Sequence, residues 1–139
     1  MLTIPSSHRN LLDEAYHAVL TTMMPDGQPQ SSIVWCDYDG EYVLVNTTRE
    51  RQKSKNMLAN PKVTLVVIDP ADNSRWIEIR GEVEITEAGA LEHIDAITRR
   101  FTHKQHFYGD VKPLEQRGRE TRIIAKIKPI KITLDAIHK

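Results

Sequence analysis

The sequence predicts a mainly β domain of the α+β class, a barrel of about six mostly antiparallel strands with small flanking helices. Three observations predict it: short segments rich in β-branched residues, turn sequences between consecutive segments, and helical periodicity confined to a few flanking stretches. Strands joined by short turns pair antiparallel, and curling such a sheet into a barrel removes its exposed edges. The 139 residues suit a single domain, residues 1–139.

The predicted elements follow one another without internal repeats. Proline, glycine and asparagine separate them, because these residues set turn geometry or stop helices. We expect a first helix after Pro5-Ser6-Ser7, with an apolar stripe from Leu11 to Val19, followed by strands at 19–24, 31–38 and 41–45. A helix at 49–59 and strands at 63–68 and 76–85 come next. The chain then continues with a helix opened by Thr86-Glu87, whose stripe runs from Leu91 to Phe101, a polar loop at 102–118, and a final strand at 123–134 bent at Pro129.

The strand at 76–85 has the clearest alternation of apolar and polar side chains. Ile77 and Ile79 share its apolar face, whereas Trp76 lies on the other face, which is otherwise charged. A large aromatic residue on a charged face indicates either a covered surface residue or part of a subunit interface. We favour the interface.

Composition excludes several classes of function. The chain has 19 Lys plus Arg and 19 Asp plus Glu, so no overall field directs it to nucleic acid or to an anionic membrane. Cys36 is the single cysteine, which excludes an intramolecular disulfide and a multi-cysteine zinc site. The N-terminal MLTIPSSHRN lacks an apolar signal core, and no stretch approaches the ~20 apolar residues of a membrane span, so we expect a cytoplasmic protein.

The segment 46–56 contradicts the usual preferences of a helix N-terminus. The start of a helix carries partial positive charge and free N–H groups, and so favours acidic side chains. Here four cations crowd it, and their like-charge i,i+4 pairs each cost about 0.2–0.5 kcal/mol. A bound phosphate would reverse this penalty, because it accepts hydrogen bonds from the helix N–H groups, from Thr47 and Thr48, and from Arg51 and Lys53. A solvated basic helix face explains the same residues, and both interpretations stay open at this point.

An ordered series of segments covers almost the whole chain. The segments are Leu20-Thr21-Thr22 before Pro25-Asp26-Gly27, PQSSIVWCDYDGEYVLVNT from Pro29 to Thr47, RERQKSKNMLANPKV from Arg49 to Val63, RWIEIRGEVEI from Arg75 to Ile85, and RETRIIAKIKP from Arg119 to Pro129. In this series the sequence resembles the pyridoxamine 5′-phosphate oxidase-like family, and within it the coenzyme F-420-dependent oxidoreductase branch. The resemblance implies a split β-barrel of the FMN-binding type.

The resemblance also implies a homodimer with two cofactor sites at the interface, which agrees with the small interior of a domain of this size. In such proteins the helix-start segment holds the cofactor phosphate, the backbone of the second strand lies along the tricyclic ring, and the strand that carries Trp76 approaches from the partner subunit. The cofactor-binding residues that we expect are Ser31, Ser32, Ile33, Val34, Trp35, Asn46, Thr47, Thr48, Arg51, Gln52, Lys53, Asn56 and Trp76.

One departure from the family pattern bears on the cofactor. Pyridoxamine phosphate oxidases place basic residues on the second strand, whereas residues 28–38 contain no Lys or Arg. The surplus of cations at 49–55 suits coenzyme F-420, which carries a phosphodiester and an acidic oligoglutamate tail. We therefore expect an oxidoreductase that transfers a hydride between F-420 and an unsaturated or carbonyl-bearing small molecule. The alternatives are an FMN-binding oxidoreductase of the same fold and a non-enzymatic flavin or deazaflavin carrier.

Four other side chains are of types that can take part in catalysis or metal binding. The phenol of Tyr108 is a candidate proton donor by position alone. His103 and His106 are spaced to share a helix face as metal or haem ligands, but a polar loop is the ordinary interpretation and we expect no metal. Cys36 has no basic neighbour in the sequence that would activate it, so we assign it no nucleophilic role.

Overall fold

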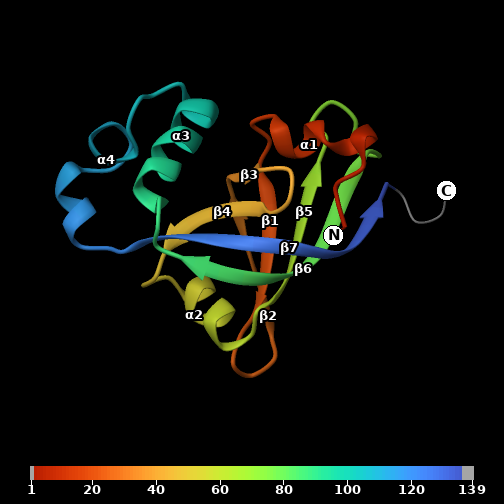
Figure 1. Ribbon diagram of the computed structural model, residues 1–139, viewed down its shortest axis with the longest axis horizontal. Helices are drawn as coiled ribbons and strands as arrows, with labels where there is room; N and C mark the ends of the chain where they lie inside the picture. The colour runs from red at the N-terminus through yellow and green to blue at the C-terminus, as the bar shows by residue number, and fades with distance from the viewer. Residues whose placement is uncertain (1, 136–139) are drawn as a thin grey trace.

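In the computed structural model, which describes residues 2–135, seven strands form one antiparallel sheet in the order β2-β1-β5-β6-β7-β4-β3 (Figure 1). The mainly β class predicted from the sequence is confirmed; Met1 and residues 136–139 of the predicted domain lie outside the described residues. The elements are the 3-10 helix η1 (Ser6–His8), α1 (Asn10–Asp13), β1 (Ala18–Met23), β2 (Pro29–Val34), β3 (Cys36–Tyr38), β4 (Val43–Thr48), α2 (Gln52–Ala59), β5 (Lys62–Ile68), β6 (Trp76–Thr86), α3 (Ala90–Thr102), α4 (Phe107–Asp110), the 3-10 helix η2 (Leu114–Gly118) and β7 (Arg122–Leu134).

The sheet curls because its two edge strands, β2 and β3, are consecutive in the chain. Only Trp35 separates Val34, which ends β2, from Cys36, which begins β3. Since consecutive Cα atoms are about 3.8 Å apart, the two edges come within roughly 7.6 Å of each other here. The described residues show no β2–β3 pairing, so the barrel closes at this corner and is split elsewhere. The prediction of a single strand at 31–38 is wrong, because the chain leaves one sheet edge at Trp35 and joins the other. Val34, Cys36 and Tyr38 are nevertheless buried in alternation, so the sequence pattern gives no sign of this interruption.

The core lies inside the curl and is built from alternate residues of the strands. Burial alternates along β1 and along β5, as the period of two requires. Each fully buried Leu or Ile side chain stabilises the fold by about 1.5–3 kcal/mol relative to its exposed state. The largest fully buried side chains include Leu11, Leu12, Leu20, Leu65, Ile77, Ile79, Ile97, Ile123 and Ile127.

The two longest strands, β6 and β7, bend together at one irregularity. The pairing shifts between Arg80, which faces Lys131, and Gly81, which faces Pro129, so Ile130 is the extra residue and is 56% exposed. A Cβ at Gly81 would meet the Lys128 carbonyl oxygen at 2.5 Å, so this close approach requires glycine. The bend predicted at Pro129 is thereby explained.

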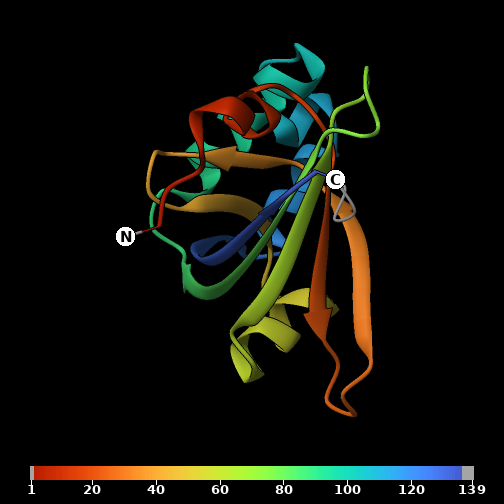
Figure 2. The same ribbon diagram turned by 90° about the vertical axis from the view of Figure 1, so that its right-hand side faces the viewer.

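The helices lie at the ends of the sheet. Figure 2 shows α2 at the end opposite α1 and α3. The helical stripe predicted to run to Val19 is wrong beyond Asp13, because the backbone is already extended at Glu14 and the chain enters β1 at Ala18. The stripe on α3 is confirmed at its centre, where Ile94 is buried. The helix predicted at 49–59 begins at Gln52, and the loop predicted at 102–118 contains α4 and η2. Among the described residues, no helix is long and apolar enough to cross a membrane.

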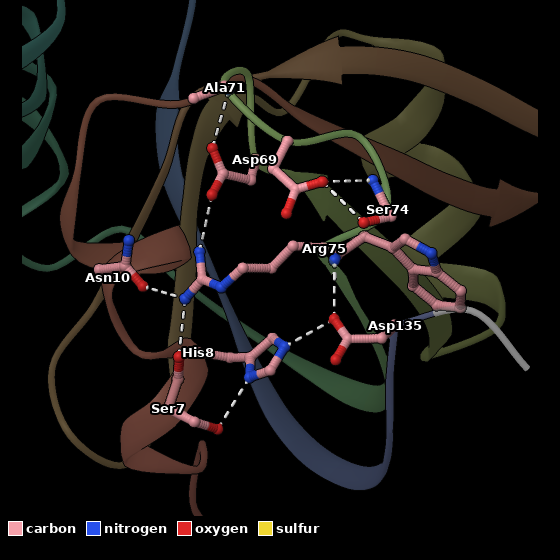
Figure 3. A network of polar contacts seen from close by, with 10 residues as sticks. Ser7, His8, Asn10, Asp69, Ala71, Ser74, Arg75 and Asp135 are labelled. Atoms are coloured by element: carbon pink, nitrogen blue, oxygen red, sulfur yellow. Dashed lines mark hydrogen bonds and ion pairs between the residues drawn. The ribbon is translucent and has the colours of Figure 1, made fainter. Parts of the chain in front are cut away.

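A network of polar contacts fixes the N-terminal segment against the end of the sheet (Figure 3). His8 lies between the Ser7 hydroxyl and the Asp135 carboxylate, with a distance of 2.8 Å to each. Arg75 donates to Asp69 at 2.9 Å and to the Ser7 carbonyl at 2.7 Å. These contacts hold the segment that leads into β1.

Candidate functional site

A cavity of about 420 Å³ lies where β2 ends, beside the start of α2 and beneath α3 and α4. It brings together the end of β2, the end of β4 and the start of β7, which are distant in the chain. Its lining residues are His17, Ile33, Val34, Trp35, Asn46, Thr47, Arg51, Lys53, Ile94, Phe107, Val111, Lys112 and Arg122. Both stretches that the sequence marked as a site, the second strand and the helix-start segment, therefore meet at one cavity.

The charged side chains that line this cavity are cations. Arg51 and Lys53 come from the start of α2, and Lys112 and Arg122 come from the loop after α4 and from β7. No aspartate or glutamate of the described residues lines it. Burial, followed by repulsion from Arg51, lowers the pKa of Lys53 below its usual value. An anion bound here would relieve that repulsion.

The hydroxyl of Thr47 is the clearest sign of a missing partner. Thr47 is only 3% exposed, lines the cavity, and its Oγ1 has no hydrogen-bond partner among the described residues. A buried polar group without a hydrogen-bond partner lowers the stability of the fold by about 1–3 kcal/mol. The neighbouring helix α2 starts after the extended residue Arg51, and no described side chain caps it. Free helix N–H groups, a buried hydroxyl and two cations form a suitable site for a phosphate.

The opposite wall is apolar and aromatic. Ile33, Trp35 and Phe107 contribute to it. The indole of Trp35 stacks on Phe101, with 5.3 Å between ring centroids and 17° between planes. Such a wall accommodates a flat aromatic ligand. The cavity therefore fits a molecule with an aromatic ring system at one end and an anionic group at the other.

Arg122 is a cation that is locked in place. Its Nε donates to the Tyr108 hydroxyl at 2.9 Å, Nη1 donates to Asn46 Oδ1 at 3.2 Å, and Nη2 lies 3.1 Å from Glu120. Its guanidinium also lies 4.4 Å from the centre of the Phe107 ring. These three hydrogen bonds use three of its five N–H groups. The guanidinium of Arg122 is therefore held in a fixed position in the cavity lining.

Sequence reasoning missed six lining residues, of which His17, Lys112 and Arg122 are polar and Ile94, Phe107 and Val111 are apolar. Arg122 opens an apolar run, Arg-Ile-Ile-Ala, in which an arginine is unusual and must be paired. That context is a signal of a buried charge, although it does not reveal which cavity the charge faces. His17 and Lys112 have no comparable signal in the sequence.

The structure places the other predicted contacts outside the cavity lining. Ser31 is exposed and its hydroxyl lies 2.8 Å from that of Thr21, while Trp76 lies at the far start of β6. Gln52 donates to Asn56 at 2.8 Å, and Asn56 in turn donates to Thr22 at 3.1 Å, which ties α2 to β1. Ser32 and Thr48 also lie outside the lining. The Thr48 carbonyl oxygen accepts a hydrogen bond of 2.5 Å from the Ser54 hydroxyl. Their assignment to the cofactor stays a prediction.

The remaining candidate side chains also have defined surroundings. Tyr108 is buried outside the lining and donates to Glu120 at 2.7 Å, so its proton already has an acceptor. Burial raises the pKa of the Cys36 thiol to about 12, which is consistent with an inert cysteine. His103 and His106 are exposed, and the described residues contain no group of three or more His, Cys, Asp or Glu arranged to hold a metal ion.

A second cavity, of about 450 Å³, lies on the outer face of the sheet. Its lining carries both signs of charge, Lys62 and Arg80 with Glu82, around apolar side chains that include Met23 and Ile130. It has no unpaired buried hydroxyl and no helix N-terminus among the described residues. We therefore take the cationic cavity as the functional site.

A curled antiparallel sheet whose two edge strands do not pair, with a cavity at the corner between them, defines the FMN-binding split-barrel class. The family model described as pyridoxamine 5′-phosphate oxidase matches residues 4–134, and the chain belongs to this family. The family predicted from the sequence is thereby confirmed.

Solved structures agree with this assignment. An F420 reductase shares 30% sequence identity, with 94% of this chain and 98% of that chain covered and a TM-score of 0.79. A conserved hypothetical protein from Mycobacterium tuberculosis shares 22% identity over 95% of this chain and 84% of its own, with a TM-score of 0.74. A Listeria innocua protein provisionally described as a pyridoxamine 5′-phosphate oxidase shares 22% sequence identity over 92% of this chain and 94% of its own, with a TM-score of 0.69. The search of curated proteins found no match.

Proposed function

We propose that this protein is a coenzyme F-420-dependent oxidoreductase that transfers a hydride between the deazaflavin and an unsaturated or carbonyl-bearing small molecule. The observation that carries the proposal is the lining of the cavity, where four cations and an unpaired buried threonine hydroxyl face an aromatic wall. The F420 reductase that shares 30% identity over nearly the full length supports the same cofactor.

The chain's own residues have separable roles in this proposal. Arg51, Lys53 and the Thr47 hydroxyl hold the phosphate, together with the N-terminus of α2. Trp35 and the end of β2 form a dry wall along one face of the ring, which excludes water from the reacting carbon. Bound at this wall, the deazaflavin supplies or accepts the hydride, so the protein needs no acid–base pair of its own for that transfer.

The cation count favours F-420 over FMN. FMN carries one terminal phosphate, which Arg51, Lys53 and the helix N-terminus satisfy. Lys112, which follows α4, also lines the cavity, and no aspartate or glutamate of the described residues accompanies it there. The phosphodiester and oligoglutamate carboxylates of F-420 supply further anions. FMN remains the second candidate because the family is named for an FMN-dependent oxidase.

A homodimer is part of the proposal. Ile33, which lines the cavity, is 64% exposed, so this wall of the cavity faces solvent and is available to a partner subunit. The outer face of the sheet carries the second cavity with the exposed Ile130, and also Ile68, which is 49% exposed at the end of β5. Trp76 pairs with Ile68 across β5 and β6, so it belongs to the same face. Sedimentation equilibrium tests this part: a dimer for the natural chain and a monomer for Ile130→Lys are the expected results.

Separate titrations of the purified protein with F-420 and FMN test the cofactor assignment. Ligand fluorescence and quenching of tryptophan emission follow the binding, since Trp35 lies in the lining. Tight F-420 binding with weak FMN binding is the expected result. The reverse result would assign the protein to the FMN-binding oxidoreductases. Tight binding with no turnover of quinones or enones would indicate a carrier, and binding of neither ligand would refute the proposed function.

A further inference from the structure

The cavity contains one side chain of a type that ionises near neutral pH, His17, and we propose that it is the acid that protonates the substrate. This proposal rests on the proposed function. His17 immediately precedes β1, whose first residue Ala18 pairs with Val34, so the imidazole lies beside the β2–Trp35 corner where the ring is expected. Its ring meets Phe101 edge-on, with 5.9 Å between centroids and an interplanar angle of 67°.

The reaction requires such a group in order to balance. A hydride delivered to the β-carbon of an enone, or to a carbonyl carbon, brings both electrons of the new C–H bond. The π pair of the substrate then moves onto the α-carbon or the oxygen, which must take up a proton. The imidazolium N–H of His17 donates that proton, and water restores it afterwards. His17 is exposed, so solvent reaches it for this second step.

The other polar side chains of the cavity are poorer acids for this step. Arg51 and Arg122 do not release protons at neutral pH. Lys112 is an ammonium group whose residue type ionises near pH 10.4, far from the operating pH at which general acids are most effective. The pKa of Lys53 is lowered, but the proposed function places this ammonium on the cofactor phosphate, away from the ring. Tyr108 lies outside the lining, and its hydroxyl donates a hydrogen bond to the Glu120 carboxylate.

The position of His17 is fixed by aromatic packing. Phe101 touches the imidazole edge-on and stacks on Trp35, so the three rings form one unit at the mouth of the cavity. The charged groups around this unit are the four lining cations and the ion pair of Arg100 with Asp37 at 2.9 Å, in which the guanidinium lies 5.2 Å from the centre of the Phe101 ring.

A binding measurement tests the position without turnover. In ¹H–¹³C spectra of histidine-labelled protein, the Cε1–H cross-peak of His17 is assigned by its loss in His17→Gln. Saturating oxidised F-420 should shift this peak, because the bound ring lies beside it. The peak of His103, an exposed histidine at the end of α3, is the internal control and should not move. A His17 peak that stays unchanged while F-420 binds would overturn the proposal.

A kinetic measurement tests the role. Single turnovers of reduced F-420 with menadione and with 2-cyclohexenone are followed between pH 6 and pH 8. We expect His17→Gln to keep the Kd for F-420 within about twofold and to lower the rate by about 100-fold, the lower end for general acid catalysis. The decline in rate of the natural protein as pH rises should disappear in the variant. His103→Asn, which suits the left-handed backbone at that residue, should match the natural protein.

The outcomes separate the two proposals. If the natural protein binds neither F-420 nor FMN, the proposed function fails, and the role of His17 fails with it. If the natural protein binds F-420 and reduces an acceptor, but His17→Gln keeps its rate and its pH profile, only the role of His17 is overturned. Binding without turnover of any quinone or enone indicates a carrier and also overturns the acid role.

Discussion

Replacing the two cations at the start of α2 is the sharpest perturbation of the proposed phosphate site. Arg51 and Lys53 both line the cavity, and each supplies a charge-assisted hydrogen bond of about 1.5–3 kcal/mol to an anion. Arg51 is exposed, so the lower end applies, and the pair contributes about 3 kcal/mol. Since 1.4 kcal/mol is tenfold in Kd, the double variant Arg51→Ala/Lys53→Ala should bind F-420 roughly 100-fold more weakly. Titration by ligand fluorescence measures this.

The ligand-free protein should not lose stability. The pKa of Lys53 is lowered in the folded state, so its charge opposes folding at neutral pH, and removing it should leave the melting temperature unchanged or slightly raised. A matched control is Arg49→Ala/Lys55→Ala, which removes one arginine and one lysine from the same segment but from outside the lining. Equal affinities for the test and control variants would show that the phosphate binds elsewhere. A drop in affinity together with unfolding would show that the segment is structural.

Three further predictions concern single residues. The pKa of Asp37 falls from 3.8 to about 2, chiefly through His93, whose Nε2 lies 3.5 Å from the carboxylate, and through the hydrogen bond from Arg100 at 2.9 Å, so Asp37→Asn should cost about 1–2 kcal/mol of unfolding free energy above pH 4. This difference from the natural protein should vanish as pH falls through 2 in urea titrations, and a difference that does not change with pH would contradict the assignment. Thr47→Val removes the unpaired hydroxyl, and should raise or preserve the melting temperature while weakening F-420 binding about tenfold; unchanged binding would remove Thr47 from the site. Cys36 should resist a thiol reagent at pH 8 until the protein is unfolded, as rapid modification of the native state would show that the thiol is accessible.

The sequence by itself determined the class, the family and the approximate position of the site. Period-two alternation placed β6 to within a residue at each end, and β-branched, apolar composition placed β5 equally well. The cations at the start of α2 contradict helix preferences, and they indeed lie at the cavity. A local conflict of this kind is visible in the sequence because it depends only on neighbours in the chain.

The tertiary structure alone decided how distant segments meet. The break at Trp35 is invisible in the sequence, since burial continues to alternate from Val34 to Cys36 while the chain crosses from one sheet edge to the other. That crossing closes the barrel and brings β2 beside β4 and β7. His17 and Arg122, 105 residues apart in the chain, line the same cavity for this reason. Their meeting depends on sheet order and curl, which arise from long-range packing rather than from any local pattern.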